Sequence, residues 1–188
     1  MTKRGGKIIL EAAAVVPFVE KYRQQGKKIV LTQGSFDLVH IGHARYCREA
    51  KKHGDILIVG VDSDEKVRTR KGPDRPVVPE DERLEMLTYL SAVDHVVLKE
   101  LNAPKYNLIK LIRPDVLIAT KQTYTEDKIK QLEKICGKVV VLEPRATTST
   151  SAKIRRLQIG FMQKIGAILQ KRMSEAMDDI LKELQKEL

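Results

Sequence analysis

Residues 28–43 read K-I-V-L-T-Q-G-S-F-D-L-V-H-I-G-H and combine three structural signals in order. Residues 28–32 form a short β-branched run typical of a buried strand, and Gly34 marks a turn. A helical pattern of apolar residues then extends over 42–53. Strand, glycine turn and helix are the opening of a βαβ unit, so this stretch predicts a parallel sheet.

The same alternation continues along the chain on both sides of this unit. Before it, apolar spacing predicts a helix over 8–25 that ends at Gly26. After it, the patterns predict strands at 56–61, 93–98, 116–119 and 138–142, helices at 80–92, 105–112 and 126–135, and a polar loop at 62–79. Apolar strands alternating with helices favour an α/β fold, a Rossmann-like doubly wound parallel sheet covered on both faces. Ligands of such sheets bind at the carboxyl ends of the strands.

The pattern changes after the sheet, because apolar residues then recur every three or four positions from Ile165 to Leu188 without a further strand. We therefore expect a domain over 1–156 followed by one amphipathic C-terminal helix over 157–188. Its apolar stripe favours a homodimer contact, with packing on its own domain or on a membrane surface as alternatives. Acidic residues such as Glu175 and Asp178 argue against an anionic lipid surface.

Composition limits the class of protein. The net charge of +10 favours anionic partners, whereas 4% aromatic residues and no Trp leave few stacking platforms for nucleic acid. No apolar run approaches the length of a membrane span, and the N-terminus lacks a signal-peptide pattern, so we expect a cytoplasmic location with no membrane partner. Cys47 and Cys136 match no metal or redox spacing, which predicts buried thiols.

The pair His40 and His43 carries the strongest chemical signal. We expect both to lie at a helix start, where unpaired backbone N–H groups and the helix dipole attract phosphate. Imidazoles at such a site can donate hydrogen bonds to a phosphoryl group as its charge develops. A cap, a core position and a metal pair are the structural alternatives, although His53 and His95 sit in unrelated elements and supply no third metal ligand.

The motif G-S-F-D at 34–37 followed by H-I-G-H at 40–43 resembles the signature of the cytidylyltransferase-like nucleotidyltransferases. Further matches follow in the same order along the chain: Asp62-Ser63-Asp64, Arg70-Lys71-Gly72, Glu82-Arg83 and Thr150-Ser151. The resemblance covers residues 28–156. It implies that 1–156 is a nucleotidyltransferase domain.

Within that superfamily, residues 70–83 (R-K-G-P-D-R-P-V-V-P-E-D-E-R) are similar to the adenylyltransferase module of ADP-heptose synthase. The glycerol-3-phosphate cytidylyltransferases match less well, because they carry an arginine where this chain has Ser91-Ala92 before Val-Asp. The resemblance thus favours ATP and heptose 1-phosphate as substrates. Residues 120–124, T-K-Q-T-Y, replace a Gly/Asp-rich turn of both relatives, so two alternatives stay open: CTP with glycerol 3-phosphate or another alcohol phosphate, and adenylation of flavin mononucleotide.

The resemblance also assigns roles to individual residues. The catalytic residues it implies are His40, His43 and Lys71. The nucleotide-binding residues it implies are Gly34, Ser35, Phe36, Gly42, Arg145, Ser149, Thr150 and Ser151, where either Ser149-Thr150 or Thr150-Ser151 matches a terminal Ser-Thr pair. The acceptor-binding residues it implies are Asp37, Arg70 and Arg83, with orientation of the loop as the other role for Asp37.

The implied reaction is an in-line attack by the acceptor phosphate on the α-phosphorus of a nucleoside triphosphate, with release of pyrophosphate. Mg²⁺ is the expected cofactor, held by the substrate phosphates, and no residue is assigned as a metal ligand. The acceptor phosphate is already ionised, so no general base is needed. A non-catalytic nucleotide or nucleic-acid binding protein is the alternative from another class, with salt-sensitive affinity for polyanions and no pyrophosphate release.

Overall fold

The structure of the chain is a computed structural model that describes residues 2–3, 7–120, 126–143 and 150–187. The chain forms two compact units, Met1–Thr147 and Thr148–Leu188. The first unit holds the sheet and its covering helices, and the second holds one long helix.

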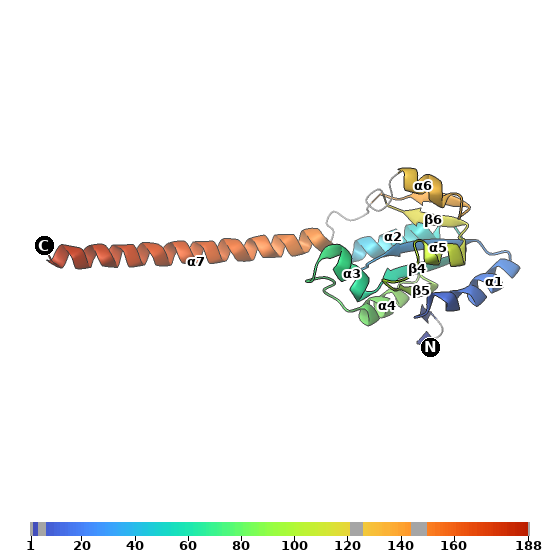
Figure 1. The fold of residues 1–188 in the computed structure, drawn as a ribbon, viewed down its shortest axis with the longest axis horizontal. Coiled ribbons are helices and arrows are strands. Elements are labelled where there is room, and N and C mark those ends of the chain that lie inside the picture. Colours follow the sequence, from blue (N-terminus) through green and yellow to red (C-terminus); the bar gives the residue numbers. More distant parts are fainter. Residues whose placement is uncertain (1, 4–6, 121–125, 144–149, 188) are drawn as a thin grey trace. The chain divides into compact units, whose positions relative to one another are not determined.

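The first unit is built on a seven-stranded sheet with the order β1-β2-β5-β4-β3-β6-β7 (Figure 1). The strands are β1 (Thr2–Lys3), β2 (Ile8–Ile9), β3 (Ile29–Gly34), β4 (Ile56–Asp62), β5 (His95–Lys99), β6 (Val116–Ala119) and β7 (Lys138–Val141). Only the edge pair β1–β2 is antiparallel among these strands, and the other pairs are parallel. The predicted α/β fold with a parallel sheet is therefore confirmed.

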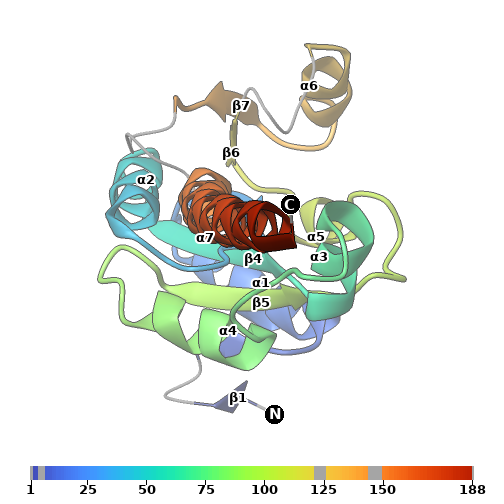
Figure 2. The same ribbon diagram turned by 90° about the vertical axis from the view of Figure 1, so that its left-hand side faces the viewer.

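Helices cover both faces of the sheet (Figure 2). They are α1 (Val16–Gln24), α2 (Ile41–Lys51), α3 (Asp64–Lys71), α4 (Glu80–Thr88), α5 (Asn107–Ile112) and α6 (Glu126–Leu132), with a 3₁₀ turn η1 (Ala12–Val15) before α1. Alternation along β3 shows the two faces: Ile29 and Leu31 pack with α1, α5 and α6, whereas Val30 packs with α2 and α4. Burial on both faces explains why the strands read as continuous apolar runs.

Two predicted elements are wrong. Residues 8–25 are not one helix, because Ile8 and Ile9 pair with β5 opposite Val96 and Val97, and α1 begins only at Val16. Residues 62–79 are not all loop, because α3 occupies Asp64–Lys71.

The apolar pattern of the sequence did not predict the helix α3, because the stability of this helix does not depend on an apolar stripe. The Oγ of Ser63 caps it by accepting from the backbone N–H of Lys66 at 3.2 Å. Acidic residues occupy its first turn and basic residues its last, as the helix dipole favours. Only Val67 in it is buried, so the periodicity of apolar residues gives no signal.

Both cysteines are free and buried, as predicted. Burial raises the pKa of the Cys47 thiol to about 12, so this group stays protonated at neutral pH.

The strand order places the predicted site. Along the chain, β3, β4 and β5 are neighbours on one side of the sheet, whereas β6 and β7 add to the other side of β3. The direction of winding thus reverses between β3 and β6, and ligands of open α/β sheets bind outside the carboxyl ends of strands at such a point. The segment 34–43 follows β3 directly and lies at this position.

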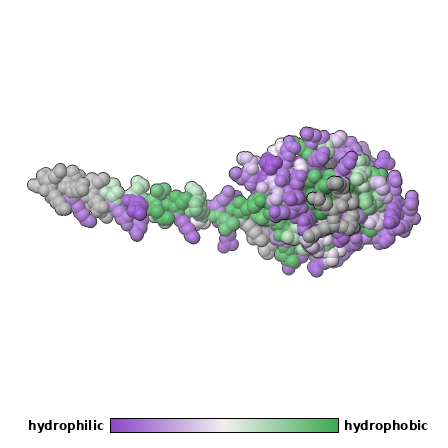
Figure 3. Space-filling view, turned by 90° about the horizontal axis from the view of Figure 1, so that it is seen from below, coloured by the Kyte–Doolittle hydropathy of each residue, from purple (hydrophilic) through white to green (hydrophobic). Residues whose placement is uncertain are grey.

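The second unit contains α7, Thr150–Glu187. The predicted C-terminal helix is present, and it begins at Thr150 rather than near residue 157. Figure 3 shows hydrophobic side chains exposed along it, and these include Leu157, Phe161, Leu169, Met173 and Met177. None of the helices in the described ranges combines the length and hydropathy needed to span a membrane.

Candidate active site

The two histidines of the motif cap α2. The Nδ1 of His40, the N-cap residue, accepts from the backbone N–H of Gly42 at 3.1 Å, and the Nδ1 of His43 accepts from the backbone N–H of His40 at 3.3 Å. The ring centroids lie 4.1 Å apart. A nitrogen that accepts from an N–H carries no proton, so in each neutral ring the hydrogen is on Nε2. The backbone of the helix start thereby sets both rings as Nε2–H donors, the form that can bind phosphoryl oxygens.

The loop before the histidines has an unusual backbone. Phe36 and Leu38 adopt positive φ angles of 48° and 51°, the left-handed region that non-glycine residues rarely occupy. The ring of Phe36 folds back over Gly34, where a Cβ would meet its Cε2 at 3.2 Å, and it also contacts the ring of His43 with centroids 5.5 Å apart. Gly34 thus provides the space that lets Phe36 support His43.

Lys71 reaches this loop from the last turn of α3. Its Nζ lies 2.9 Å from the Oγ of Ser35, so the structure brings these two predicted residues together. The pKa of Lys71 is lowered, first by desolvation of its ammonium and then by the positive charges of Arg70 and Arg75. A lysine surrounded by other cations is a group that an anionic ligand would stabilise.

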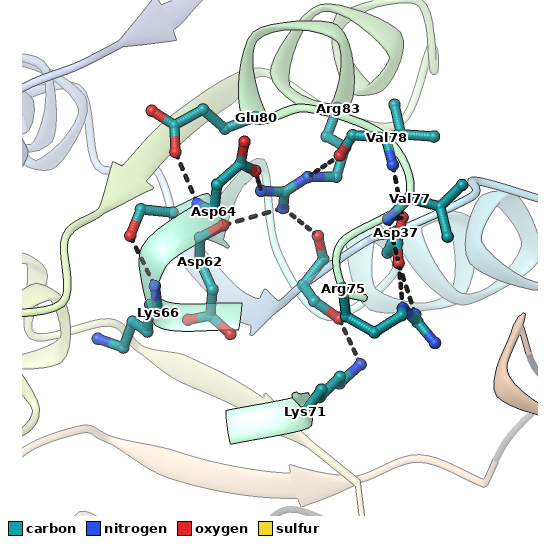
Figure 4. A network of polar contacts seen from close by, with 12 residues as sticks. Asp37, Asp62, Asp64, Lys66, Lys71, Arg75, Val77, Val78, Glu80 and Arg83 are labelled. Carbon is teal, nitrogen blue, oxygen red and sulfur yellow. Dashed lines mark hydrogen bonds and ion pairs between the residues drawn. The ribbon is translucent and has the colours of Figure 1, made fainter. Parts of the chain in front are cut away.

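Asp37 is buried and holds the loop 72–79 (Figure 4). Its carboxylate accepts from the Nε of Arg75 at 2.7 Å and from the backbone N–H groups of Val77 and Val78 at 3.1 Å each. Burial alone would raise the pKa of Asp37, but the hydrogen bonds from Val78 and Val77, followed by Arg75, lower it below its ordinary value. The structure therefore favours the loop-orienting role of Asp37 over acceptor contact.

Arg83 is the buried centre of the network in Figure 4. Its Nε donates to the carbonyl of Val78 at 2.9 Å, and its Nη1 donates to the carbonyls of Ser35 and of Asp62, the latter at 2.9 Å. Its Nη2 lies 2.7 Å from the Oδ1 of Asp64. With its side chain 0% exposed, Arg83 joins the ends of β3 and β4 to the loop, and this placement does not leave it in reach of an acceptor phosphate.

Arg70, which precedes Lys71 in α3, pairs with a second buried carboxylate. Asp62, at the end of β4, accepts from the Nζ of Lys99 at 2.9 Å and lies 2.9 Å from the Nη2 of Arg70. Burial would raise the pKa of Asp62, but Lys99, Arg70 and Lys66 lower it. The side chain of Arg70 is 51% exposed, so it can also bind an anion from solvent.

The side chains of four predicted nucleotide-binding residues lie outside the part of the chain that the structure describes. Arg145 and Ser149 lie outside the described residues. Thr150 and Ser151 form the start of α7, but their side chains also lie outside the described part.

The described residues contain no group of three or more His, Cys, Asp or Glu side chains that could hold a metal ion. Lone carboxylates near the loop, such as Asp37 and Asp62, are already engaged by cations.

The sequence did not assign roles to Arg75 and Lys99. Each neutralises a buried carboxylate, Asp37 or Asp62, that ends a strand or follows it. A buried charged residue at the end of an apolar strand requires a partner of opposite charge. The sequence therefore indicates that such a partner exists, but it does not indicate which residue it is.

Comparisons with known proteins identify the family of the chain. The family model described as cytidylyltransferase-like matches residues 31–181. The bifunctional protein HldE of Methylobacillus flagellatus is 42% identical over 142 residues, which are 74% of this chain and 29% of that protein. The HldE protein of Wolinella succinogenes is 39% identical over 155 residues, 80% of this chain and 31% of that protein. The chain thus spans less than a third of the length of these relatives.

Two solved structures share the fold. A lipopolysaccharide core biosynthesis protein from Thermoplasma volcanium has a TM-score of 0.57 and 28% identity, covering 64% of this chain and all of that one. A pantoate-beta-alanine ligase from Francisella tularensis has a TM-score of 0.56 over 72% of this chain and 66% of that one, and at 16% identity it shows similarity of fold alone. The match of the family model over most of the chain confirms the resemblance carried by the loop 34–43, and this protein belongs to the cytidylyltransferase-like family of nucleotidyltransferases.

Proposed function

We propose that this chain transfers AMP from ATP to the phosphate of heptose 1-phosphate and releases pyrophosphate. The observation that carries the proposal is the pair His40 and His43, fixed as Nε2–H donors at the start of α2 and at the winding reversal of the sheet. Lys71 beside Ser35 adds a cation next to the same loop.

In the proposed step, an oxygen of the acceptor phosphate attacks the α-phosphorus of ATP. The bond from that phosphorus to the bridging oxygen of the β-phosphate breaks, and the electron pair leaves with pyrophosphate. Charge grows on the α-phosphate oxygens, where Nε2–H of His40 and His43 would donate hydrogen bonds, while Lys71 and Arg145 would neutralise the flanking phosphates. Mg²⁺ would enter as part of the nucleotide substrate, bound by its phosphate oxygens.

The choice of ATP and heptose 1-phosphate is supported by residues 70–83 and by the HldE relatives. Residues 70–83 point to this pair of substrates through their resemblance to the adenylyltransferase module of ADP-heptose synthase. We propose a cytoplasmic location because nucleoside triphosphates and sugar phosphates are available there.

We also propose that the chain works as a homodimer joined through α7. The helix exposes large apolar side chains from Leu157 to Met177, which in water favours association. Its charge is divided: the part from Thr150 to Arg172 carries only basic charges, whereas acidic residues predominate from Glu175 onward. Two copies packed antiparallel would place each basic half against an acidic half.

The test is a pyrophosphate-release assay with Mg²⁺ that crosses ATP, CTP, GTP and UTP with heptose 1-phosphate, glycerol 3-phosphate and flavin mononucleotide. Release with ATP and heptose 1-phosphate alone is the expected result. Release with another pair would change the assigned substrates but not the type of reaction. No release with any pair, together with salt-sensitive binding of polyanions, would reject the enzymatic function in favour of a non-catalytic binding protein.

A further inference from the structure

A pocket of about 530 Å³ opens at the carboxyl end of β5, away from the histidines. Gln33 of β3, Lys66 of α3, Lys99 of β5 and the segment 100–108 line it, with η1 along one side. Its volume lies within the range of small-molecule sites, about 300–1,000 Å³. The reaction step above does not use this pocket.

The pocket is connected to the site through one carboxylate. Asp62 accepts from the Nζ of Lys99, which lines the pocket, and pairs with Arg70, which neighbours Lys71. Both regions therefore lie on the same edge of the sheet, at the ends of adjacent strands β4 and β5. A phosphorylated ligand could place its phosphate near Arg70 and Lys71 and its remaining part in the pocket.

The lining favours an uncharged, hydroxyl-rich group. Amide and carboxylate side chains from Gln33, Glu100 and Asn102 supply both donors and acceptors, the combination that hydroxyls require. Two of the three lining lysines are already engaged by protein oxygens, since Lys99 binds Asp62 and the Nζ of Lys66 donates to the carbonyl of Glu100 at 3.2 Å; the third, Lys105, has its Nζ 4.9 Å from the centroid of the Tyr106 ring. Their charges are thus partly compensated, which makes the pocket a poorer place for a second phosphate.

Tyr106 provides the observation that points to a ligand. Its Oη is buried and has no hydrogen-bond partner within the described part of the chain. Its backbone has a positive φ of 61° at the start of α5, so the ring is held there at a cost in backbone strain. A buried hydroxyl without a partner is unfavourable, and a ligand hydroxyl would satisfy it.

Gly60 of β4 lies against three of the lining residues. A Cβ on Gly60 would lie 2.7 Å from a methyl carbon of Leu108, 2.8 Å from the Cδ of Lys99 and 3.2 Å from the Cγ of Gln33. The absence of a side chain on β4 therefore lets these three lining residues pack directly on the sheet. Any larger residue would push them into the pocket.

We infer that this pocket binds the sugar hydroxyls of the acceptor and so selects a carbohydrate phosphate, an inference that rests on the proposed function. Glycerol 3-phosphate is too small to fill it. Flavin mononucleotide lacks a matching surface, because Tyr106 is the one aromatic residue among the described lining residues.

The test is Tyr106→Phe in the full chain, which removes only the unpartnered oxygen and keeps the ring. Tyr89→Phe is the matched control, since Tyr89 is exposed on α4. For Tyr106→Phe we expect the KM for heptose 1-phosphate to rise about five- to tenfold, as for the loss of one hydrogen bond. The KM for ATP and the melting temperature should stay unchanged.

A second measurement separates the pocket from the proposed reaction. Binding of free heptose, without nucleotide, is followed by saturation-transfer NMR. If the chain releases no pyrophosphate but binds free heptose, and Tyr106→Phe weakens that binding, the reaction fails and the pocket assignment stands. Equal heptose binding by wild type and Tyr106→Phe, or a KM for heptose 1-phosphate that does not change, would overturn the pocket assignment.

Discussion

The Nδ1 atom of His43 accepts a hydrogen bond from the backbone N–H of His40 at 3.3 Å, and the Nδ1 of His40 accepts from the backbone N–H of Gly42 in the first turn of α2. The two rings therefore perform the work of a capping box, which is ordinarily done by Ser or Thr with Glu or Gln. The acceptor nitrogen of each ring serves the helix, while the chemistry proposed for the site uses the other nitrogen. These two roles can be separated by substitution.

The double variant His40→Asn/His43→Gln keeps a side-chain acceptor at both capping positions and removes both imidazoles. We expect pyrophosphate release to fall by about 10²–10³-fold or more, as when oriented donors to a developing anion are lost. The melting temperature should change by only a few degrees. Full activity in this variant would show that the histidines only cap α2.

The alkaline limb of the pH–rate profile tests Lys71. Its pKa is lowered, so its ammonium is lost at a lower pH than the ordinary value of about 10.4. If this charge serves the reaction, kcat/KM should fall as pH rises through that lowered pKa. Lys71→Arg keeps its charge over the whole range and should move the fall to higher pH. An identical alkaline limb in both proteins would show that the fall in kcat/KM is not caused by loss of the charge on Lys71.

Arg83→Met separates a buried network role from acceptor binding. The variant leaves Asp64 and three carbonyl groups without their donor, and breaking a buried charge pair costs about 3–5 kcal/mol. We expect denaturant unfolding to show that the free energy of unfolding falls by this amount in Arg83→Met. The control Arg68→Met should show no such fall, because Arg68 is exposed on α3. Unchanged stability with a raised acceptor KM would return Arg83 to the acceptor-binding role.

The sequence predicted the parts of this fold that depend on periodic burial. The strands β3 to β6 are buried along most of their length, so their apolar runs stand out, and the loop 34–43 follows from a glycine and a helix start. The strand β2 was missed because it has only two residues and its parallel partner β5 is far away in the sequence. The helix α3 was missed because capping and dipole charges define it, whereas only Val67 is buried.

Motif matching predicted the site residues, but only the structure shows which of them are buried. Asp37 and Arg83 are charged residues of a kind usually found on the surface, yet their side chains are 1% and 0% exposed and bind protein groups. That assignment depends on the path of the loop 72–79 over β3 and β4, which no local pattern encodes. The partners Arg75 and Lys99 were missed for the same reason.

Asp37 should contribute stability that depends on pH. Its folded pKa lies below the unfolded value of about 3.9, so its contribution is present above that value and is lost as pH falls through the folded pKa. Asp37→Asn should therefore be less stable than wild type at pH 7, with a difference that shrinks below about pH 4. Urea unfolding at pH 7 and pH 3 measures this, with Asp74→Asn in the same loop as control. A difference that is constant with pH would contradict an ionised Asp37.

The proposed homodimer can be tested on the full chain by placing a charge in the apolar side of α7. Leu169→Glu adds a carboxylate at an apolar position that is 57% exposed, whereas Gln170→Glu adds the same charge one residue later, outside the apolar series. We expect light scattering after size exclusion to give a dimer for wild type and Gln170→Glu, and a monomer for Leu169→Glu. Antiparallel pairing also predicts that added salt weakens the dimer, because opposite charges on the two halves of α7 would be screened. A wild-type monomer at micromolar concentration would contradict the dimer proposal. A dimer that becomes more stable in salt would support an apolar contact through α7 but contradict the antiparallel arrangement.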